Sequence, residues 1–211
     1  MLTVWGRRDS SNVQAVMWGI AELGLEHRRI DAGHRFGVND TPEFLAMNPN
    51  GLVPVIRDGE GPPLFESAAI LRYLANRYGR APFWPEDVEA RAQVDMWAEW
   101  ARQTIVVPFT GGIFLQLVRT PEAQRDLGQV ARTVTALAKP LAIAEARLAK
   151  HPWICGEAMT LADIQMGNVL YRYHTLPFER PELPALSAYY ERLTQHAPYA
   201  EHVMVPYDAL R

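Results

Sequence analysis

The chain has 211 residues, of which 48% are hydrophobic and 21% charged, and its net charge at pH 7 is −3. This is the composition of an ordinary soluble globular protein, with room for one large or two small domains. No apolar run approaches the length of a membrane span, the N-terminus lacks the architecture of a signal peptide, and no broad basic bias favours nucleic acid. We therefore expect a cytoplasmic protein with neither a membrane nor a nucleic acid as partner.

The first thirty residues alternate between strand and helix patterns. Residues 2–5 form a short apolar run, and residues 6–12 form a polar loop. Apolar side chains then recur at helical spacing over 13–23, and Gly24 marks the end of that helix. Residues 25–30 return to an extended pattern. The order strand, helix, strand predicts a parallel pair of strands with a right-handed crossover.

The next fifty residues complete a mixed domain. A helix start at 41–43 is followed by a short helix that ends near Met47. Turns and short apolar runs over 49–65 predict two paired strands, and a further helix begins at Glu66-Ser67 and ends at Gly79. We predict the order β-α-β-α-β-β-α for residues 1–80, which is the α/β arrangement of a thioredoxin-like domain.

The turn before the third strand has the features of a peptide-binding site. Pro54 has no N–H and stands at the start of a strand, so it is a candidate for a cis peptide bond, and Val53 before it cannot be helical. The backbone of Val53 would then face outward, free to pair with an extended peptide. The helix that begins at Glu66-Ser67 offers unpaired N–H groups and partial positive charge, which can bind a carboxylate.

These residues resemble a known family. Asn48-Pro-x-Gly-x-Val-Pro54, followed by Glu66-Ser67-x-x-Ile70-x-x-Tyr73-Leu74, is similar to the glutathione-binding half of the cytosolic glutathione transferases. The resemblance implies that the bond before Pro54 is cis, that Val53 pairs with the cysteinyl part of glutathione, and that Glu66 and Ser67 hold its γ-glutamyl end. The alternative is an ordinary turn proline and a plain helix cap.

One position departs from the pattern of the family. Leu52 stands where many relatives have Lys, Arg or Gln to meet the glycine carboxylate of glutathione. The partners that remain possible for this carboxylate are His34, Arg35, Asn48 and Asn50.

The loop before the first helix carries the candidate catalytic residues Ser10, Ser11 and Asn12. A free thiol has a pKa near 8.5, so catalysis must stabilise the glutathione thiolate, and a hydroxyl donor near a helix N-terminus can do so. The spacing Ser-x-Asn resembles the serine-type members of the family, theta-like or bacterial Nu-like. On that alignment Ser10 is the thiol's donor and Asn12 a second polar partner. Any of the three could instead be only the helix cap.

The second half of the chain shows helical patterns alone. Residues 81–87 are rich in helix breakers and form the predicted linker, and residues 88–211 are predicted to form an all-α domain. A helix over 86–107 is expected to break at Pro108 and at Gly111-Gly112, and to resume over 113–118. Another helix begins at 120–122 and continues to about Lys150, and Pro140 either kinks it or divides it in two.

Residues 160–163 form a capping box, Thr160-Leu-Ala-Asp163, before an apolar helix. Asp163 is predicted to be structural, because a buried carboxylate needs N–H partners such as a cap supplies. The glutathione transferases have a similar box at the centre of their second domain, which is a second match. A final helix is expected over 184–196. The single cysteine, Cys155, cannot form an internal disulfide, and no Cys/His spacing predicts a metal site.

The resemblance implies a glutathione S-transferase, with glutathione as co-substrate, no metal, and an electrophilic small molecule as acceptor. It also implies a homodimer with an isologous interface formed by 67–78 and 86–104. The alternatives are a glutathione-dependent disulfide reductase or peroxidase, and a non-catalytic glutathione-binding protein. The sequence does not identify the acceptor. Four aromatic residues are candidates for its pocket, although ordinary core is an equal interpretation for each: Trp97, Trp100, Phe109 and Phe114.

Overall fold

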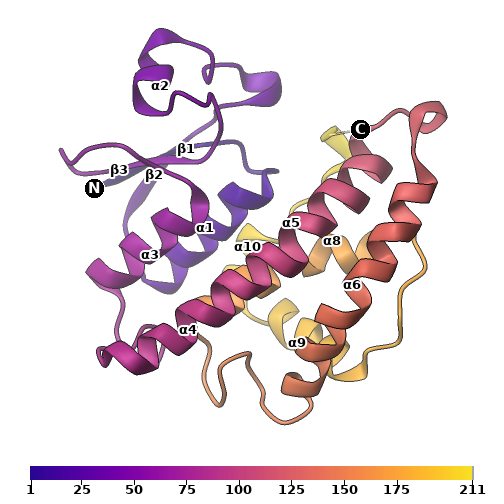
Figure 1. The fold of residues 1–211 in the computed structure, drawn as a ribbon. Helices are drawn as coiled ribbons and strands as arrows, with labels where there is room; N and C mark the ends of the chain where they lie inside the picture. Colours follow the sequence, from indigo (N-terminus) through magenta and orange to yellow (C-terminus); the bar gives the residue numbers. More distant parts are fainter. Residues whose placement is uncertain (211) are drawn as a thin grey trace.

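The computed structural model describes residues 1–210. A small sheet with its helices comes first, and a bundle of helices follows and lies beside it (Figure 1). This is the predicted fold class, a thioredoxin-like α/β part followed by an all-α part. Among residues 1–210 we find no helix with both the length and the apolar character needed to span a membrane.

Within residues 1–210, four short strands form the sheet in the order β2-β1-β3-β4. β1 pairs in parallel with β2 and antiparallel with β3, which is itself antiparallel to β4. The predicted parallel pair is thus confirmed, and α1 (Ser11–Glu22) is its crossover. The strand bounds are Leu2–Trp5 (β1), His27–Ile30 (β2), Val55–Asp58 (β3) and Leu64–Phe65 (β4).

Helices cover both faces of the sheet (Figure 1). α1 and α3 (Ser67–Tyr78) pack on the face toward the helical part, and α2 (Pro42–Met47) packs on the other face. Successive side chains of a strand point to opposite faces of the sheet. Ile56 therefore belongs to the main core with α1 and α3, whereas its neighbour Val55 packs with Phe44 of α2. A short 3₁₀ turn, His34–Phe36, lies between β2 and α2.

One long helical rod opens the second part, and here the predicted break is wrong. α4 (Val88–Ala101) continues through α5 (Val107–Phe109) to residue 119 without a gap. The turns on both sides of α5 are wide π-helical turns, in which an N–H bonds the carbonyl five residues back. Before α5, for example, the N–H of Val107 bonds the carbonyl of Arg102. Pro108 has no N–H and its ring crowds the carbonyl four residues earlier, so wide turns relieve both problems without ending the helix.

The next helix, α6 (Leu127–Leu148), is single and contains Pro140 in its interior. This settles the choice that the sequence left open. The helix starts later than predicted, because Asp126 caps it by accepting the N–H of Gln129 at 2.7 Å, while a short 3₁₀ turn occupies Glu122–Gln124.

Four shorter helices complete the bundle, followed by a 3₁₀ turn. The predicted capping box is present at the start of α7, and the helix predicted over 184–196 is α9. It is not the final helix, because α10 begins at Ala197 after the N-cap residue His196. The bounds are Leu161–Gly167 (α7), Leu170–Thr175 (α8), Pro184–Thr194 (α9), Ala197–His202 (α10) and Asp208–Leu210 for the turn.

Asp163 is fully buried behind that capping box. Its carboxylate accepts hydrogen bonds from the N–H groups of Ile154 (3.0 Å) and Thr160 (2.8 Å), and from the hydroxyls of Tyr189 (2.9 Å) and Thr160 (3.2 Å). Burial raises the pKa of Asp163 to about 6, while the four donors oppose that rise. The carboxylate thus ties α7 to the segment before it and to α9.

The two parts share one core. Trp18 of α1 is fully buried and meets the ring of Tyr199 of α10 edge to face, with 4.9 Å between ring centroids. A Cβ placed on Gly167 of α7 would lie 2.8 Å from the Trp18 ring, so only glycine allows this approach. The large side chain of the α/β part is therefore inserted between two helices of the all-α part.

Candidate active site

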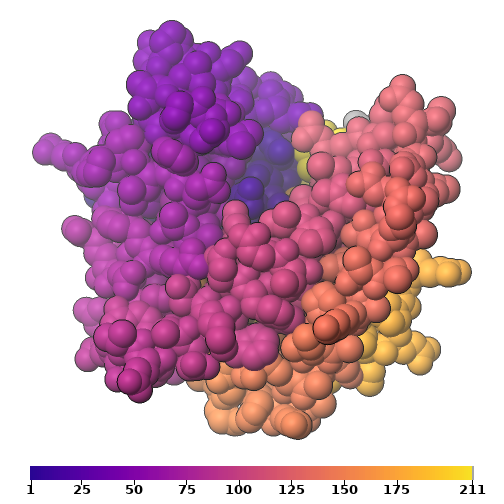
Figure 2. All heavy atoms as spheres, in the orientation of Figure 1, coloured from indigo at the N-terminus to yellow at the C-terminus, as the bar shows by residue number. Residues whose placement is uncertain are grey.

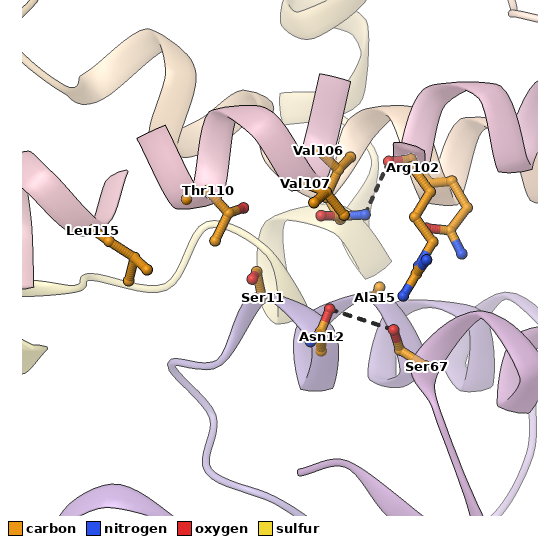
Figure 3. Close-up of a pocket in the computed structure, with 12 residues that line it drawn as sticks. Ser11, Asn12, Ala15, Ser67, Arg102, Val106, Val107, Thr110 and Leu115 are labelled. Carbon is orange, nitrogen blue, oxygen red and sulfur yellow. Dashed lines mark hydrogen bonds between the residues drawn. The ribbon is translucent and has the colours of Figure 1, made fainter. Parts of the chain in front are cut away.

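A cleft of about 280 Å³ lies where the two parts meet. One wall comes from the first turns of α1 and α3, and the facing wall comes from the long helix between Arg102 and Leu115 (Figure 3). Figure 2 shows the surface hollowed between the N-terminal part and this helix, with indigo atoms from the start of the chain at the back.

Two helix N-termini converge at the cleft. The hydroxyl of Ser67, on the first residue of α3, donates a hydrogen bond of 3.3 Å to the carboxamide oxygen of Asn12 on α1 (Figure 3). Each N-terminus presents unpaired N–H groups and partial positive charge. Their joint position favours a ligand that carries negative charge at this end of the cleft.

The structure separates the two candidate serines. Ser10 is the N-cap of α1 and is 9% exposed, and Ser11 is the first helical residue and lines the cleft with Asn12. The Ser10 side chain makes no capping hydrogen bond, and within residues 1–210 neither hydroxyl has a hydrogen-bond partner. Both hydroxyls are therefore available to a ligand, and the helix leaves its usual capping bond unmade.

The turn before β3 has the expected outward backbone. The peptide bond between Val53 and Pro54 is cis, as predicted, and Pro54 is buried. Among the described residues, no hydrogen bond engages the backbone N–H or C=O of Val53. Leu52 beside it is 62% exposed. An extended peptide could pair with Val53 there as an added strand.

Glu66 completes this edge in an uncommon backbone conformation. Its φ of 67° and ψ of 110° lie in a region that residues other than glycine rarely adopt. Its carboxylate stands 3.7 Å from the guanidinium of Arg102 on the long helix. Such conformations persist where the surroundings hold them, and they cluster at ligand sites.

The other candidate partners for the glycine carboxylate differ in whether their side chains are already engaged within the protein. Asn48 is buried and holds its own turn, because its Nδ2 donates to the carbonyl of Leu52 at 2.8 Å and its Oδ1 accepts from the N–H of Asn50 at 3.1 Å. Arg35 pairs with the buried Asp9 at 3.3 Å and is half exposed. Burial and nearby arginines lower the pKa of His34.

None of the four aromatic residues that the sequence singled out lines the cleft. Phe109 and Phe114 are buried in the core, and Trp97 and Trp100 contact each other edge to face with 5.0 Å between centroids. These four positions lie on the same long helix as the cleft wall, but other positions of that helix line the cleft. The cleft-facing positions that the sequence interpretation missed are Arg102, Val106, Val107, Thr110, Gly111 and Leu115.

Two buried amides on the helical side also escaped prediction. Gln165 and Asn168 line the cleft from α7 and the residue after it. The signal available in the sequence was their polarity within an otherwise apolar run. Within residues 1–210 we find no group of three or more metal-ligating side chains suited to hold an ion.

Comparisons with known proteins agree with this geometry. The family model described as "Glutathione S-transferase, N-terminal domain" matches residues 1–76, and "Glutathione S-transferase, C-terminal domain" matches residues 101–197. The glutathione S-transferase GstB of Escherichia coli K12 is 38% identical over 207 residues, which cover 98% of this chain and 99% of that protein.

A solved structure extends the likeness to three dimensions. The theta class glutathione S-transferase from Xanthomonas axonopodis pv. citri, crystallised with glutathione bound, has a TM-score of 0.90 and 42% identity, covering 97% of this chain and 98% of that one. A more distant relative, the disulfide-bond oxidoreductase YghU of Escherichia coli K12, is 29% identical and is covered over 59% of its length. With both domain models matched and full-length relatives well above 30% identity, this chain belongs to the glutathione S-transferase family.

Proposed function

We propose that the protein binds glutathione at the convergence of the α1 and α3 N-termini and joins its thiol to an electrophilic small molecule in the cleft. The observation that carries the proposal is the pair of serine hydroxyls at the start of α1, both without partners, beside two helix ends that favour negative charge. The 38% identity to GstB over the whole chain supports the same activity.

Glutathione would lie along the edge formed by residues 52–54 and 66–67. Val53 would pair its backbone with the cysteinyl part, in a position that the cis bond at Pro54 provides. Ser67 and the N-terminus of α3 would bind the γ-glutamyl carboxylate, with Glu66 facing the γ-glutamyl ammonium group. Leu52, exposed beside them, would contact the glycine end without a charge.

The thiol would lie at Ser10. The hydroxyl of Ser10 would donate to the sulfur, with Asn12 as second polar partner, and the proton lost by the thiol would pass to water. The thiolate then forms a bond to an electrophilic carbon, and a leaving group departs with its electron pair. Where the acceptor is an activated double bond, water returns a proton to the neighbouring carbon instead. Ser11, which lines the cleft, would face the acceptor.

The acceptor would occupy the cleft against Val106, Val107, Thr110 and Leu115, and we propose these in place of Trp97, Trp100, Phe109 and Phe114. The cleft is mixed in character, with apolar side chains from the long helix and the polar groups of Arg102 and Gln165. Small electrophiles with an apolar body suit this lining.

Two assays test the activity. Conjugation of a chlorinated aromatic to glutathione is expected, with slower reduction of a mixed disulfide. A faster disulfide reduction would favour the second candidate, a disulfide reductase, which the likeness to YghU over 78% of this chain supports. Glutathione binding measured by calorimetry, with turnover on neither substrate, would favour a non-catalytic binding protein.

We also propose the assembly and the organisation of the chain. The domain limits are 1–80 and 88–211 with a linker over 81–87, and the protein is a cytoplasmic homodimer with an isologous interface of α3 and α4. Val88 and Met96, two exposed apolar side chains on α4, support this interface. A monomer by light scattering at micromolar concentration would contradict it.

A further inference from the structure

Arg172 of α8 is a buried arginine with an unusual set of partners. It is 3% exposed, and its Nη2 donates to the backbone carbonyl of Asp9 at 2.7 Å and to the side-chain oxygen of Gln14 at 3.4 Å. Its guanidinium carbon lies 4.1 Å from the ring centroid of Phe114. Within residues 1–210 its Nε has no hydrogen-bond partner, and no carboxylate forms a salt bridge with it.

The charged groups around Arg172 leave its charge uncompensated. The carboxylate of Asp9 is nearby, but it already pairs with Arg7 at 2.6 Å and with Arg35 at 3.3 Å. Arg7 and Tyr207 also act on Arg172 electrostatically. Burial lowers the pKa of Arg172 to about 10, so the side chain is still a cation at neutral pH. A buried charge without a counter-charge destabilises the folded state, so its presence here indicates a functional role.

The two hydrogen-bond acceptors of Arg172 lie on either side of Ser10: Asp9 ends the loop before it, and Gln14 stands in the first turn of α1. The carbonyl of Asp9 is part of the peptide bond that leads into Ser10. Gln14, itself buried, uses its Nε2 to hold the carbonyl of Arg8 at 3.2 Å while its oxygen receives Arg172. Arg172 and Gln14 thus hold the backbone carbonyls of the two residues before Ser10, and neither side chain lines the cleft.

We propose that Arg172 is a positioning residue for the thiolate, an inference that rests on the proposed glutathione site. It fixes the Asp9–Ser10 peptide, and thereby the direction of the Ser10 hydroxyl. Its charge also favours an anion at the start of α1, in addition to the helix end itself. The helical part thus contributes to thiol activation without touching glutathione.

The test removes the charge of Arg172 and measures the pKa of the bound glutathione thiol. Arg172→Met and Arg172→Gln are compared with wild type by titrating thiolate absorbance in the glutathione complex, and glutathione affinity is measured by calorimetry. We expect the thiol pKa to rise by about one unit in both variants, with affinity changed by less than about threefold, because the charge acts on the thiolate more than on the bound peptide. Arg172→Lys keeps the charge and is expected to restore part of the shift.

Arg147 of α6 provides a matched control. Its Nε donates to the carbonyl of Ile154 at 2.8 Å and its guanidinium lies 4.0 Å from the Trp97 ring centroid, so it has the same kinds of partner away from the cleft. Arg147→Met should leave the thiol pKa unchanged.

The outcomes separate the two hypotheses. If wild type binds glutathione and lowers its thiol pKa, but folded Arg172→Met or Arg172→Gln lowers it equally, the role of Arg172 is overturned and the proposed function stands. If wild type neither binds glutathione nor lowers its thiol pKa, the proposed function fails and this inference fails with it. Arg172→Gln retains an N–H donor for Asp9, so it provides the measurement if Arg172→Met does not fold.

Discussion

The hydroxyl of Ser67 donates to the carboxamide oxygen of Asn12 across 3.3 Å, and this contact joins the first turn of α3 to the first turn of α1. The two residues are 55 positions apart in the chain. The bond holds two helix N-termini side by side, so a single extended ligand can reach both.

Ser67→Ala is expected to weaken glutathione binding by roughly tenfold, because a hydrogen bond to a charged group contributes about 1.5 kcal/mol or more. The γ-glutamyl carboxylate is charged before, during and after reaction, so turnover at saturating glutathione should change little. Calorimetry and steady-state kinetics measure the two effects. Ser187→Ala on α9, far from the cleft, is the control. Unchanged affinity in Ser67→Ala would remove this residue from the site.

Ser10→Ala is expected to act on chemistry instead. A hydrogen bond that forms to the thiolate contributes about 1.5–3 kcal/mol, which corresponds to a rise of one to two units in the pKa of the bound thiol. Thiolate absorbance in the glutathione complexes of Ser10→Ala and Ser11→Ala measures the shift. A rise only in Ser11→Ala would move the assignment by one residue. No rise in either variant would show that the serine mechanism is wrong here.

The sequence carried more information about the α/β part than about the cleft. Turn residues, helix caps and the cis proline are local signals, so the order of elements through Gly79 followed from them, as did the capping box at Thr160. The side of the long helix that faces the cleft depends on its rotation. The wide turns around Pro108 change that rotation by amounts that a regular helical period does not describe. The four aromatic residues were chosen for their apolar character on these helices, which does not reveal that Val106 and Thr110 face the cleft.

The paired glycines on the long helix should behave differently. A Cβ on Gly112 would lie 2.1 Å from the hydroxyl oxygen of Thr133 on α6, whereas a Cβ on Gly111 would meet nothing within 4 Å. Gly112→Ala should lower the free energy of unfolding by about 1–3 kcal/mol through overpacking. Gly111→Ala should leave it unchanged or raise it by up to about 1 kcal/mol, since alanine favours helix.

Denaturant unfolding of both variants measures this difference. Combining Gly112→Ala with Thr133→Ala should recover part of the loss, because the closest atom is then removed. Equal stability of the two single variants would mean that the long helix and α6 are not packed as closely as described.

The buried ring of His174 should make the stability of the protein depend on pH. Its ring stacks on Tyr190 with 4.2 Å between centroids, and its Nε2 is buried without a partner among the described residues. Burial, assisted by Arg180, lowers the pKa of His174 from 6.5 to about 4. As pH falls from 6.5 to 4, the unfolded chain takes up a proton that the folded chain does not, so the folded state loses stability over that interval.

His174→Phe removes this proton uptake. The loss of unfolding free energy between pH 7 and pH 4.5 should be smaller in the variant than in wild type by about 1–2 kcal/mol. Water around the half-buried ring keeps this difference below the full value that the pKa shift implies. Urea unfolding at both pH values gives the difference. His151→Phe, at an exposed histidine, should follow wild type. A gain of the same size in His151→Phe would contradict the assignment to His174.

Trp18 has a consequence for how the molecule unfolds. Because its ring occupies space between Gly167 and Tyr199, the sheet with its helices cannot separate from the bundle without exposing a large apolar side chain and leaving a hole in each half. The two family domains should therefore melt as one cooperative unit, with equal calorimetric and van't Hoff enthalpies. Shrinking the side chain, as in Trp18→Ala, should uncouple the halves into two transitions.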